Sequence, residues 1–469
     1  MSPGGFSRLS STNSKRDTPD SERVSPPPLK RKAAAQSTIS KNAVANFFTP
    51  TSQKPKDRTT WTERSPNSDT PATLLVGKYV PDKEENSKSA TLTKERTKIA
   101  AFDFDSTLIA PASGKRHAHD AADWKWWHHS VPGRLRQMYN DEGYQVVVFT
   151  NQGGLTLHPD PKSKTPKIHQ TRVPAFKQKC GVVLAQLDIP ITVYAATGKD
   201  IFRKPRPGMW NEMKADYDLD DSDIDLEHCI FIGDAGGRAA EVKGGATIPK
   251  DFSCSDRNLA DNIGIKFQTP DEFFLGEAPR AFTRDFDVTS FEYTEPDDKD
   301  SVVFEKTNKQ DVVLFVGPPG AGKSSFYWKH LEPLSYWRIN QDILKSKEKC
   351  FKEAADGLKV GASIIIDNTN PDPEIRAQWI ELAKKHKVPI RCVWFKTPLQ
   401  LCEHNDAVRS LNKQLNPESR SSLPKLAFNG FASRFKEPKI KEGFQDIVEV
   451  DFKFQGTKEE FNIWARYWL

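Results

Sequence analysis

The stretch Gly317-Pro-Pro-Gly-Ala-Gly-Lys-Ser324 decides the fold of the C-terminal part of this 469-residue chain. It fits the pattern G-x-x-x-x-G-K-[ST], in which backbone N–H groups at a helix N-terminus surround the phosphates of a nucleotide. The apolar run Val312–Val316 before it predicts the buried strand that such a loop follows. Further apolar runs at 362–367 and 390–395 predict strands of the same parallel sheet.

The same pattern assigns residues to a nucleotide. Lys323 is expected to reach the β- and γ-phosphate oxygens, and Ser324 to bind Mg²⁺. The motif predicts nucleotide binding without separating a kinase from an ATPase or a GTPase. The predicted cofactor-binding set comprises Gly317, Gly320, Gly322, Lys323, Ser324, Ser325 and Arg409.

Two acidic residues come after this phosphate-binding loop (the P-loop), each close to the end of a predicted strand. Asp342, in Asn340-Gln-Asp342, could accept the proton of an attacking hydroxyl, as a kinase requires, or could cap a helix. Asp367 ends the next predicted strand and suits substrate or metal contact. Arg376 is a candidate for an acceptor phosphate and Arg409 for a lid contact with ATP, although either could be a surface arginine.

A different phosphate chemistry lies upstream, where Asp103 and Asp105 follow the strand-like run Lys98–Phe102. Aspartates at i and i+2 after a strand project toward one pocket. One carboxylate can attack phosphorus and form an aspartyl-phosphate. A second carboxylic acid can protonate the leaving oxygen and then deprotonate the hydrolytic water. Such a pocket needs countercharge, so we expect Mg²⁺.

The supporting groups follow in order, each after a predicted strand. Thr150 and Asn151 can donate hydrogen bonds to phosphoryl oxygens, Arg203 and Lys204 can neutralise the transition state, and Asp234 offers a further carboxylate. The set resembles the haloacid-dehalogenase superfamily of phosphatases. The resemblance implies that Asp103 is the nucleophile and Asp105 the general acid/base, with the metal held by the Asp103 side chain, the Asp105 backbone carbonyl and Asp234.

The gap between Asp105 and Gln145 is too short for a separate cap domain. An uncapped site suits a large substrate such as a polynucleotide end, whereas a metabolite phosphatase favours an enclosed site.

Seven ordered motifs over residues 97–469 resemble the polynucleotide kinase 3′-phosphatase family of DNA end-repair enzymes: D-F-D-S-T-L, F-T-N-Q-G, F-R-K-P, G-D-A-G-G-R, D-F-S-C-S-D-R, G-P-P-G-A-G-K-S and I-D-N-T-N-P-D. The resemblance implies removal of 3′-phosphates and ATP-dependent phosphorylation of 5′-hydroxyls at DNA ends. It makes Asp342 the general base of the kinase, Arg409 a lid arginine and Asp256 a further acid near the phosphatase site. The alternatives are a bifunctional metabolite kinase/phosphatase and a non-catalytic repair scaffold.

These patterns predict an α/β protein of two domains: a haloacid-dehalogenase-like Rossmannoid parallel sheet followed by a P-loop kinase parallel sheet. We expect a disordered basic tail over 1–94, the phosphatase over 95–280, a linker over 281–308 and the kinase over 309–469. The first 90 residues carry 15 Lys or Arg against 9 Asp or Glu, and so account for the whole net charge of +6. Any nucleic-acid surface on the folded part must therefore be a local basic patch.

The tail holds two short features. Lys30-Arg-Lys32 could direct nuclear import, although a solvated charge run is the alternative. Val44, Phe47 and Phe48 have the spacing of a sliding-clamp-binding peptide, with Lys41 in place of the usual leading Gln. The tail also stands where animal members carry a phosphopeptide-binding domain.

The remaining composition sets limits on class. No apolar run approaches the length of a membrane span. The six cysteines are scattered, with no C-x-x-C pair, which favours reduced thiols over a disulfide framework or a zinc site. We expect a monomer that has no membrane contact and acts in the nucleus.

Overall fold

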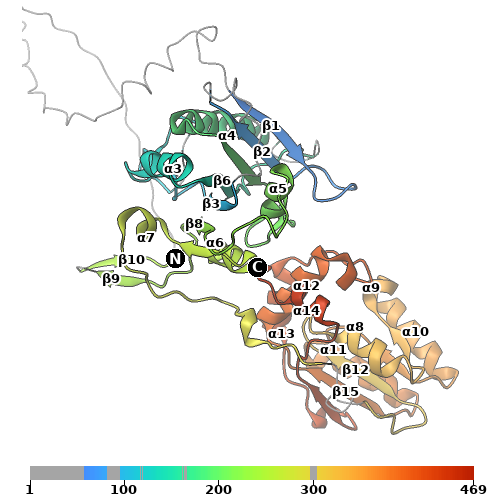
Figure 1. Cartoon of the computed structure of the whole chain (residues 1–469). Coiled ribbons are helices and arrows are strands. Elements are labelled where there is room, and N and C mark those ends of the chain that lie inside the picture. The colour runs from blue at the N-terminus through green and yellow to red at the C-terminus, as the bar shows by residue number, and fades with distance from the viewer. Residues whose placement is uncertain are drawn as a thin grey trace, which may run out of the picture. The chain divides into compact units, whose positions relative to one another are not determined.

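The computed structural model describes residues 58–81, 96–295 and 304–469, apart from 117, 119, 161, 163–165 and 244. They form two main sheets, each with helices of its own (Figure 1). Each sheet also has hydrophobic clusters of its own. The predicted fold class is therefore confirmed. None of the helices in these ranges is long and apolar enough to cross a membrane.

The first sheet has seven strands in the order β1-β2-β7-β6-β3-β8-β11. They are β1 (Thr59–Arg64), β2 (Leu74–Tyr79), β3 (Lys98–Phe102), β6 (Tyr144–Asn151), β7 (Ile191–Ala196), β8 (Ile230–Ile232) and β11 (Lys266–Gln268). The last five run parallel, whereas β1 and β2 are antiparallel additions next to β7. Because β3 lies between β6 and β8, the ends of three strands meet at one edge, where such sheets place active sites.

Helices cover both faces of this sheet. Along β3, Ala100 and Phe102 face one cluster while Ile99 and Ala101 face the other, since successive side chains alternate across a strand. The first cluster receives α3 (Val131–Asn140) and α4 (Pro166–Leu187); the second receives α5 (Gly208–Asp216) and α6 (Ser255–Ile263). α7 (Pro270–Leu275) follows β11, and the short hairpins are β4 (Ile109–Ala110) with β5 (Lys125–Trp126) and β9 (Glu241–Lys243) with β10 (Ala246–Ile248).

The chain between Asp105 and β6 holds only the β4–β5 hairpin and α3 in its described part. As predicted, it has no room for a cap domain.

The predicted boundary of the tail is wrong. Strands β1 and β2 lie within the range assigned to it, and β2 pairs with β7 over six residues from Leu74 to Tyr79. Leu74 and Leu75 are fully buried, one on each face of the sheet. These two strands are short, and the sequence around them is rich in Ser, Thr, Pro and Lys. Composition averaged over the whole predicted tail therefore indicates disorder and does not reveal the hairpin.

The second sheet is wholly parallel, in the order β13-β14-β12-β15-β16. Its strands are β12 (Val312–Val316), β13 (Trp337–Ile339), β14 (Ile364–Ile366), β15 (Ile390–Phe395) and β16 (Ile447–Val450). One face packs on α10 (Lys347–Lys359) and α11 (Pro373–Lys385). The other packs on α8 (Lys323–Phe326), its π-helical continuation η4 (Tyr327–Leu331), α12 (Leu399–Leu411) and α13 (Lys425–Arg434). The short α9 (Gln341–Leu344) follows β13, and η5 (Lys413–Leu415), η6 (Ile440–Glu442) and α14 (Lys458–Trp464) complete the unit.

The predicted linker 281–308 is also partly wrong. Val288, in the short helix η3 (Val288–Ser290), is buried in a cluster with residues of α12 and α14, and Phe286, Phe291 and Tyr293 pack against it. Phe304 is buried beside Tyr336. The acidic composition suggested a solvated connection, but its aromatic side chains bury enough apolar area to hold these described parts in the core of the second sheet's unit.

Candidate active sites

The first site lies at the C-terminal ends of β3, β6 and β8. Asp103 follows β3 directly, and its backbone N–H donates to the carbonyl of Ile232 at the end of β8. Gly233 must be glycine, because a Cβ there would come within 2.2 Å of the Asp256 carboxylate. The close approach of these loops brings together acids far apart in the sequence.

Lys204 is the buried cation of this site. Its Nζ lies 2.7 Å from Asp103 Oδ1 and 2.8 Å from Asp256 Oδ1. Burial alone would lower the pKa of Lys204, but the two carboxylates outweigh it and raise the pKa. Lys204 is therefore charged at neutral pH and neutralises the group expected to attack phosphorus.

Three carboxylates crowd around this one cation. One carboxylate oxygen from each of Asp103, Asp234 and Asp256 lies within 4.8 Å of the other two. Burial, followed by the charges of neighbouring acids, raises the pKa of Asp103 and of Asp234 well above the usual range. Lys204 can offset only one of the three carboxylates when all are ionised, so the cluster fits a divalent cation with oxygen ligands such as Mg²⁺. Asp256, noted in the sequence only as a further acid, belongs to this cluster.

Asp105 stands apart from the cluster and is half exposed, with its side chain 52% accessible. Its Oδ2 accepts a hydrogen bond of 2.7 Å from Gln152, and Lys179 Nζ lies 3.4 Å from Oδ1. Gln152 also donates to Thr150 Oγ1, which leaves the hydroxyl hydrogen of Thr150 available to a phosphoryl oxygen. Asp105 is thus accessible from solvent to the leaving group of a bound substrate.

Asn151 contacts the backbone of the buried cation. Its amide group donates to the carbonyl of Lys204 and accepts from the Lys204 backbone N–H, at 3.1 and 2.9 Å. These two contacts position Lys204, and the second hydrogen of the Asn151 amide remains for a phosphoryl oxygen. Arg203 lies next to Gly153, where a Cβ would meet its Nη1 at 3.0 Å.

The second site begins where β12 ends. Gly320 and Gly322 have φ values of +79° and +89°, which favour glycine, and a Cβ on Gly320 would lie 2.3 Å from the Cys402 carbonyl oxygen. Lys323 Nζ donates to the carbonyls of Gly317 and Pro318 at 3.1 and 2.5 Å. Burial lowers the pKa of Lys323 to about 8. An anionic phosphate would favour the charged form of this lysine.

Asp367, at the end of β14, organises the loop around Ser324. It is buried, and its Oδ2 accepts from Ser324 Oγ at 3.0 Å and from the Arg338 guanidinium at 2.5 and 2.9 Å. Arg338, on β13, also donates to Ser324 Oγ at 2.9 Å. Sequence patterns did not identify Arg338, because no motif marks it.

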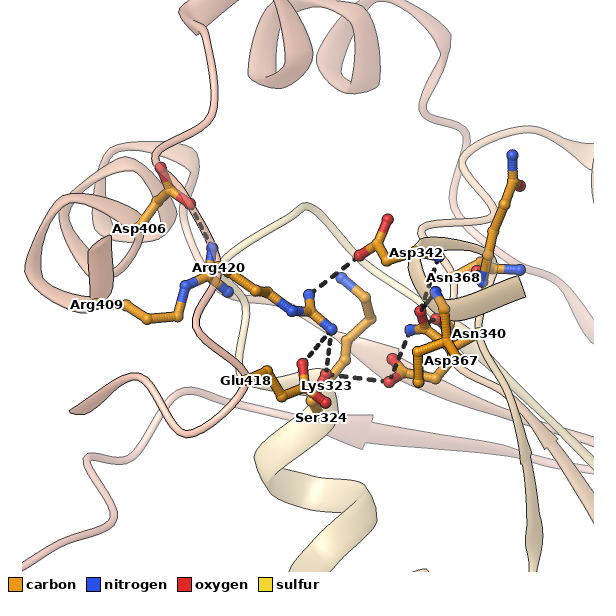
Figure 2. Close-up of polar contacts among 12 residues, drawn as sticks. Lys323, Ser324, Asn340, Asp342, Asp367, Asn368, Asp406, Arg409, Glu418 and Arg420 are labelled. Carbon is orange, nitrogen blue, oxygen red and sulfur yellow. Dashed lines mark hydrogen bonds and ion pairs between the residues drawn. The ribbon is translucent and has the colours of Figure 1, made fainter. Parts of the chain in front are cut away.

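The alternative left open for Asp342 is resolved by its neighbour. Asn340 caps α9, since its Oδ1 accepts from the N–H groups of Asp342 and Ile343. The Asp342 carboxylate is therefore not used as a cap, and its side chain is 72% exposed. It forms an ion pair with Arg420 at 3.2 Å, which Figure 2 draws as a dashed line.

A cavity of about 1500 Å³ joins these groups. Asp342, Asp367 and every predicted cofactor-binding residue except Gly317 line it, including Arg409. Gly317 does not line this cavity, and a Cβ added to it would come within 2.8 Å of Phe395. The guanidinium of Arg409 is paired with Asp406 at 2.5 Å (Figure 2).

Arg376 does not belong to this site, contrary to prediction. It is fully buried, paired with Glu442 at 2.7 and 2.8 Å, and donates further to the carbonyls of Asn370, Pro371 and Lys436. The N–H donors of Arg376 bond within the protein. Arg376 therefore holds α11 to the chain around Lys436 and has no donor free for an acceptor phosphate.

Comparison with known proteins agrees with this pair of sites. Residues 98–274 match the family model "Polynucleotide kinase 3 phosphatase", and residues 312–349 and 346–438 match an AAA domain model. A "Bifunctional polynucleotide phosphatase/kinase" of Schizosaccharomyces pombe is 38% identical over 381 residues, covering 79% of this chain and 84% of the relative. A "Putative bifunctional polynucleotide phosphatase/kinase" of Acanthamoeba polyphaga mimivirus is 32% identical over 396 residues, or 79% and 89%. Identity extended over both sheets shows that this chain belongs to the family of bifunctional polynucleotide phosphatase/kinases.

Proposed function

We propose that this chain heals DNA ends: it removes a 3′-phosphate at the first site and phosphorylates a 5′-hydroxyl with ATP at the second. The observation that carries the proposal is the buried Lys204 between Asp103 and Asp256, at an uncapped strand edge, in a chain that also holds a complete P-loop cavity. A ligase requires a 3′-hydroxyl and a 5′-phosphate, so the two reactions together prepare a break for sealing.

In the phosphatase reaction, an oxygen of Asp103 attacks phosphorus while the bond from phosphorus to the 3′-oxygen breaks. Asp105 gives its proton to the departing 3′-oxygen, and its half-exposed position suits a leaving group as large as a DNA strand. Asp105 then takes a proton from the water that hydrolyses the aspartyl-phosphate. Lys204 offsets charge on the phosphoryl oxygens throughout.

Asp103, Asp234 and the neighbouring Asp256 have the donor set to hold Mg²⁺, which would supply charge neutralisation to the phosphoryl oxygens when bound. The metal-free cluster is strained by repulsion, since burial and like charges raise the pKa of Asp103 and Asp234.

Magnesium is therefore expected to raise the melting temperature of the full chain, by about 2–4 °C for each kcal/mol of binding free energy. At neutral pH, Asp234→Asn should melt above the metal-free wild type, because a buried carboxyl whose pKa is raised to about 8 must take up a proton on folding and the amide need not. The variant should also lose most of the magnesium response. Thermal unfolding with and without MgCl₂ measures both effects. Asp285→Asn, at an exposed carboxylate, is the matched control. An unchanged response in Asp234→Asn would place the metal elsewhere.

In the kinase reaction, Asp342 takes the proton of the 5′-hydroxyl as its oxygen bonds to the γ-phosphorus of ATP. Lys323 and Ser324 lie at the N-terminus of α8, where they would hold the nucleotide phosphates. Phe452 and Phe454 line the same cavity and offer aromatic surface to a base.

The rival function, a kinase/phosphatase of small metabolites, predicts enclosure of the phosphatase site. The hairpin β4–β5 and α3 are the elements inserted after Asp105 in the described chain, and neither is a cap domain. Turnover of 3′-phosphorylated DNA against sugar phosphates at equal concentration decides between them. Preference for the sugar phosphates would contradict end healing.

We also propose that the enzyme acts as a monomer in the nucleus and binds a sliding clamp through Val44, Phe47 and Phe48. These residues and the basic cluster Lys30–Lys32 lie outside the described residues. The support for the proposal is the sequence alone: a compact basic cluster and an aliphatic–aromatic spacing in a polar tail. A fluorescent fusion with Lys30–Lys32 replaced by Ala should no longer accumulate in the nucleus; unaltered accumulation would remove the import assignment.

The clamp contact predicts that Phe47→Ala/Phe48→Ala lowers retention of the full chain on immobilised sliding clamp at least about tenfold, because two aromatic anchors carry much of such a peptide's affinity. Phe6→Ala, elsewhere in the same tail, is the control and should bind as wild type does. Equal retention of the double variant, or a wild type that is not retained, would refute this contact.

A further inference from the structure

Arg420 lines the kinase cavity, although no sequence motif marks it. Its Nη1 lies 3.2 Å from Asp342 Oδ2, and its Nη2 lies 3.5 Å from Ser324 Oγ (Figure 2). Nη2 also forms an ion pair with Glu418. A single guanidinium thus reaches both the P-loop and the acidic residue that follows β13.

The backbone holds this side chain in place. Asn416 accepts from the N–H of Arg420 at 2.9 Å and donates to its carbonyl at 2.8 Å. Glu418 is fixed from its other side by Arg338, which donates to it at 2.7 Å and also binds Asp367. The segment 416–420, which follows α12 and η5, is therefore tied to the floor of the cavity by charged contacts.

Ser324 marks the phosphate-donor side of the cavity, and Asp342 marks the side of the attacking hydroxyl. A phosphoryl group that moves from one to the other must pass between them, where the Arg420 guanidinium lies. Charge builds on the three equatorial oxygens of the transferred group, and a planar guanidinium can donate to two of them at once. Arg409, the predicted lid residue, instead has its guanidinium paired with Asp406.

We propose that Arg420 is a catalytic residue of the kinase, which binds the γ-phosphoryl group of ATP during transfer. The assignment rests on the proposed function for the identity of the donor and acceptor sides. With ATP bound, the γ-phosphoryl oxygens replace Asp342 as partners of Arg420, which frees the carboxylate to take the proton. The 5′-oxygen bonds to the γ-phosphorus, that proton passes to Asp342, and the electron pair of the breaking bond leaves with ADP.

The test uses the full-length protein with ATP, Mg²⁺ and a 5′-hydroxyl oligonucleotide. Arg420→Ala should lower kcat about 10²–10³-fold, as loss of a cation at a developing charge does, with a change of less than about fivefold in the KM for ATP. Arg420→Lys should recover part of kcat, because it restores charge without the planar pair of donors. Arg434→Ala, at an exposed arginine on α13, is the matched control and should keep wild-type kcat.

The 3′-phosphatase activity of each preparation reports whether the protein is folded, and it should be unchanged. A kcat for Arg420→Ala within threefold of wild type, or a loss confined to KM, would overturn the assignment while leaving the kinase function intact. A wild type that fails to phosphorylate 5′-hydroxyls would instead refute the proposed function, so the two failures are distinguishable.

Discussion

Replacing Asp103 by Asn is expected to lower the rate of 3′-phosphate removal by at least about four orders of magnitude. An amide cannot attack phosphorus, so the covalent step is lost. The fold should persist, because the substitution preserves shape and removes a buried carboxylate whose pKa is raised by burial. Single-turnover dephosphorylation of a 3′-phosphorylated oligonucleotide measures the loss.

The second activity is the internal control for this variant, and 5′-phosphorylation should proceed at the wild-type rate. Asp218→Asn is a matched control elsewhere: the residue is exposed, and its φ of +51° is one that Asn accepts as readily as Asp. Residual dephosphorylation within tenfold of wild type would show that another group attacks phosphorus.

Lys323→Ala is the mirror experiment and should lower 5′-phosphorylation at least about a thousandfold. The lysine is buried at the P-loop with its pKa lowered to about 8, so its charge costs stability until phosphate arrives. Its removal should therefore leave the melting temperature unchanged or higher. Radiolabel transfer from ATP to a 5′-hydroxyl oligonucleotide measures activity.

For this variant, 3′-phosphatase activity should stay at the wild-type level. Lys359→Ala is the matched control. It removes the same type of charge from an exposed lysine on α10, which is paired with Asp356 and lies outside the P-loop motif. Retained kinase activity in Lys323→Ala would mean that the nucleotide phosphates bind without this lysine.

Residues whose role depends on short-range order could be predicted from sequence. Asp103 and Lys323 each follow a strand, within a motif whose spacing is fixed by local backbone geometry. Asp256 could be proposed only by family resemblance, because its contact with Lys204 depends on how α6 packs near the strand ends. Arg420 could not be identified as a site residue from the sequence, since its position depends on an irregular segment that is held by charged contacts.

The errors have physical causes of the same kind. Arg376 and a catalytic arginine look alike in sequence, and only its full burial against Glu442 separates them. The hairpin from Thr59 to Tyr79 owes its order to pairing with β7, a partner more than a hundred residues away along the chain.

The most direct test of the account is a nicked DNA duplex with a 3′-phosphate and a 5′-hydroxyl at the nick. With ATP and Mg²⁺, the wild-type chain should convert both ends, so that added ligase seals the strand. Asp103→Asn should stop with the 3′-phosphate in place beside a new 5′-phosphate, and Lys323→Ala should stop with both ends as hydroxyls. A wild type that leaves both ends of the nick unchanged would contradict the account.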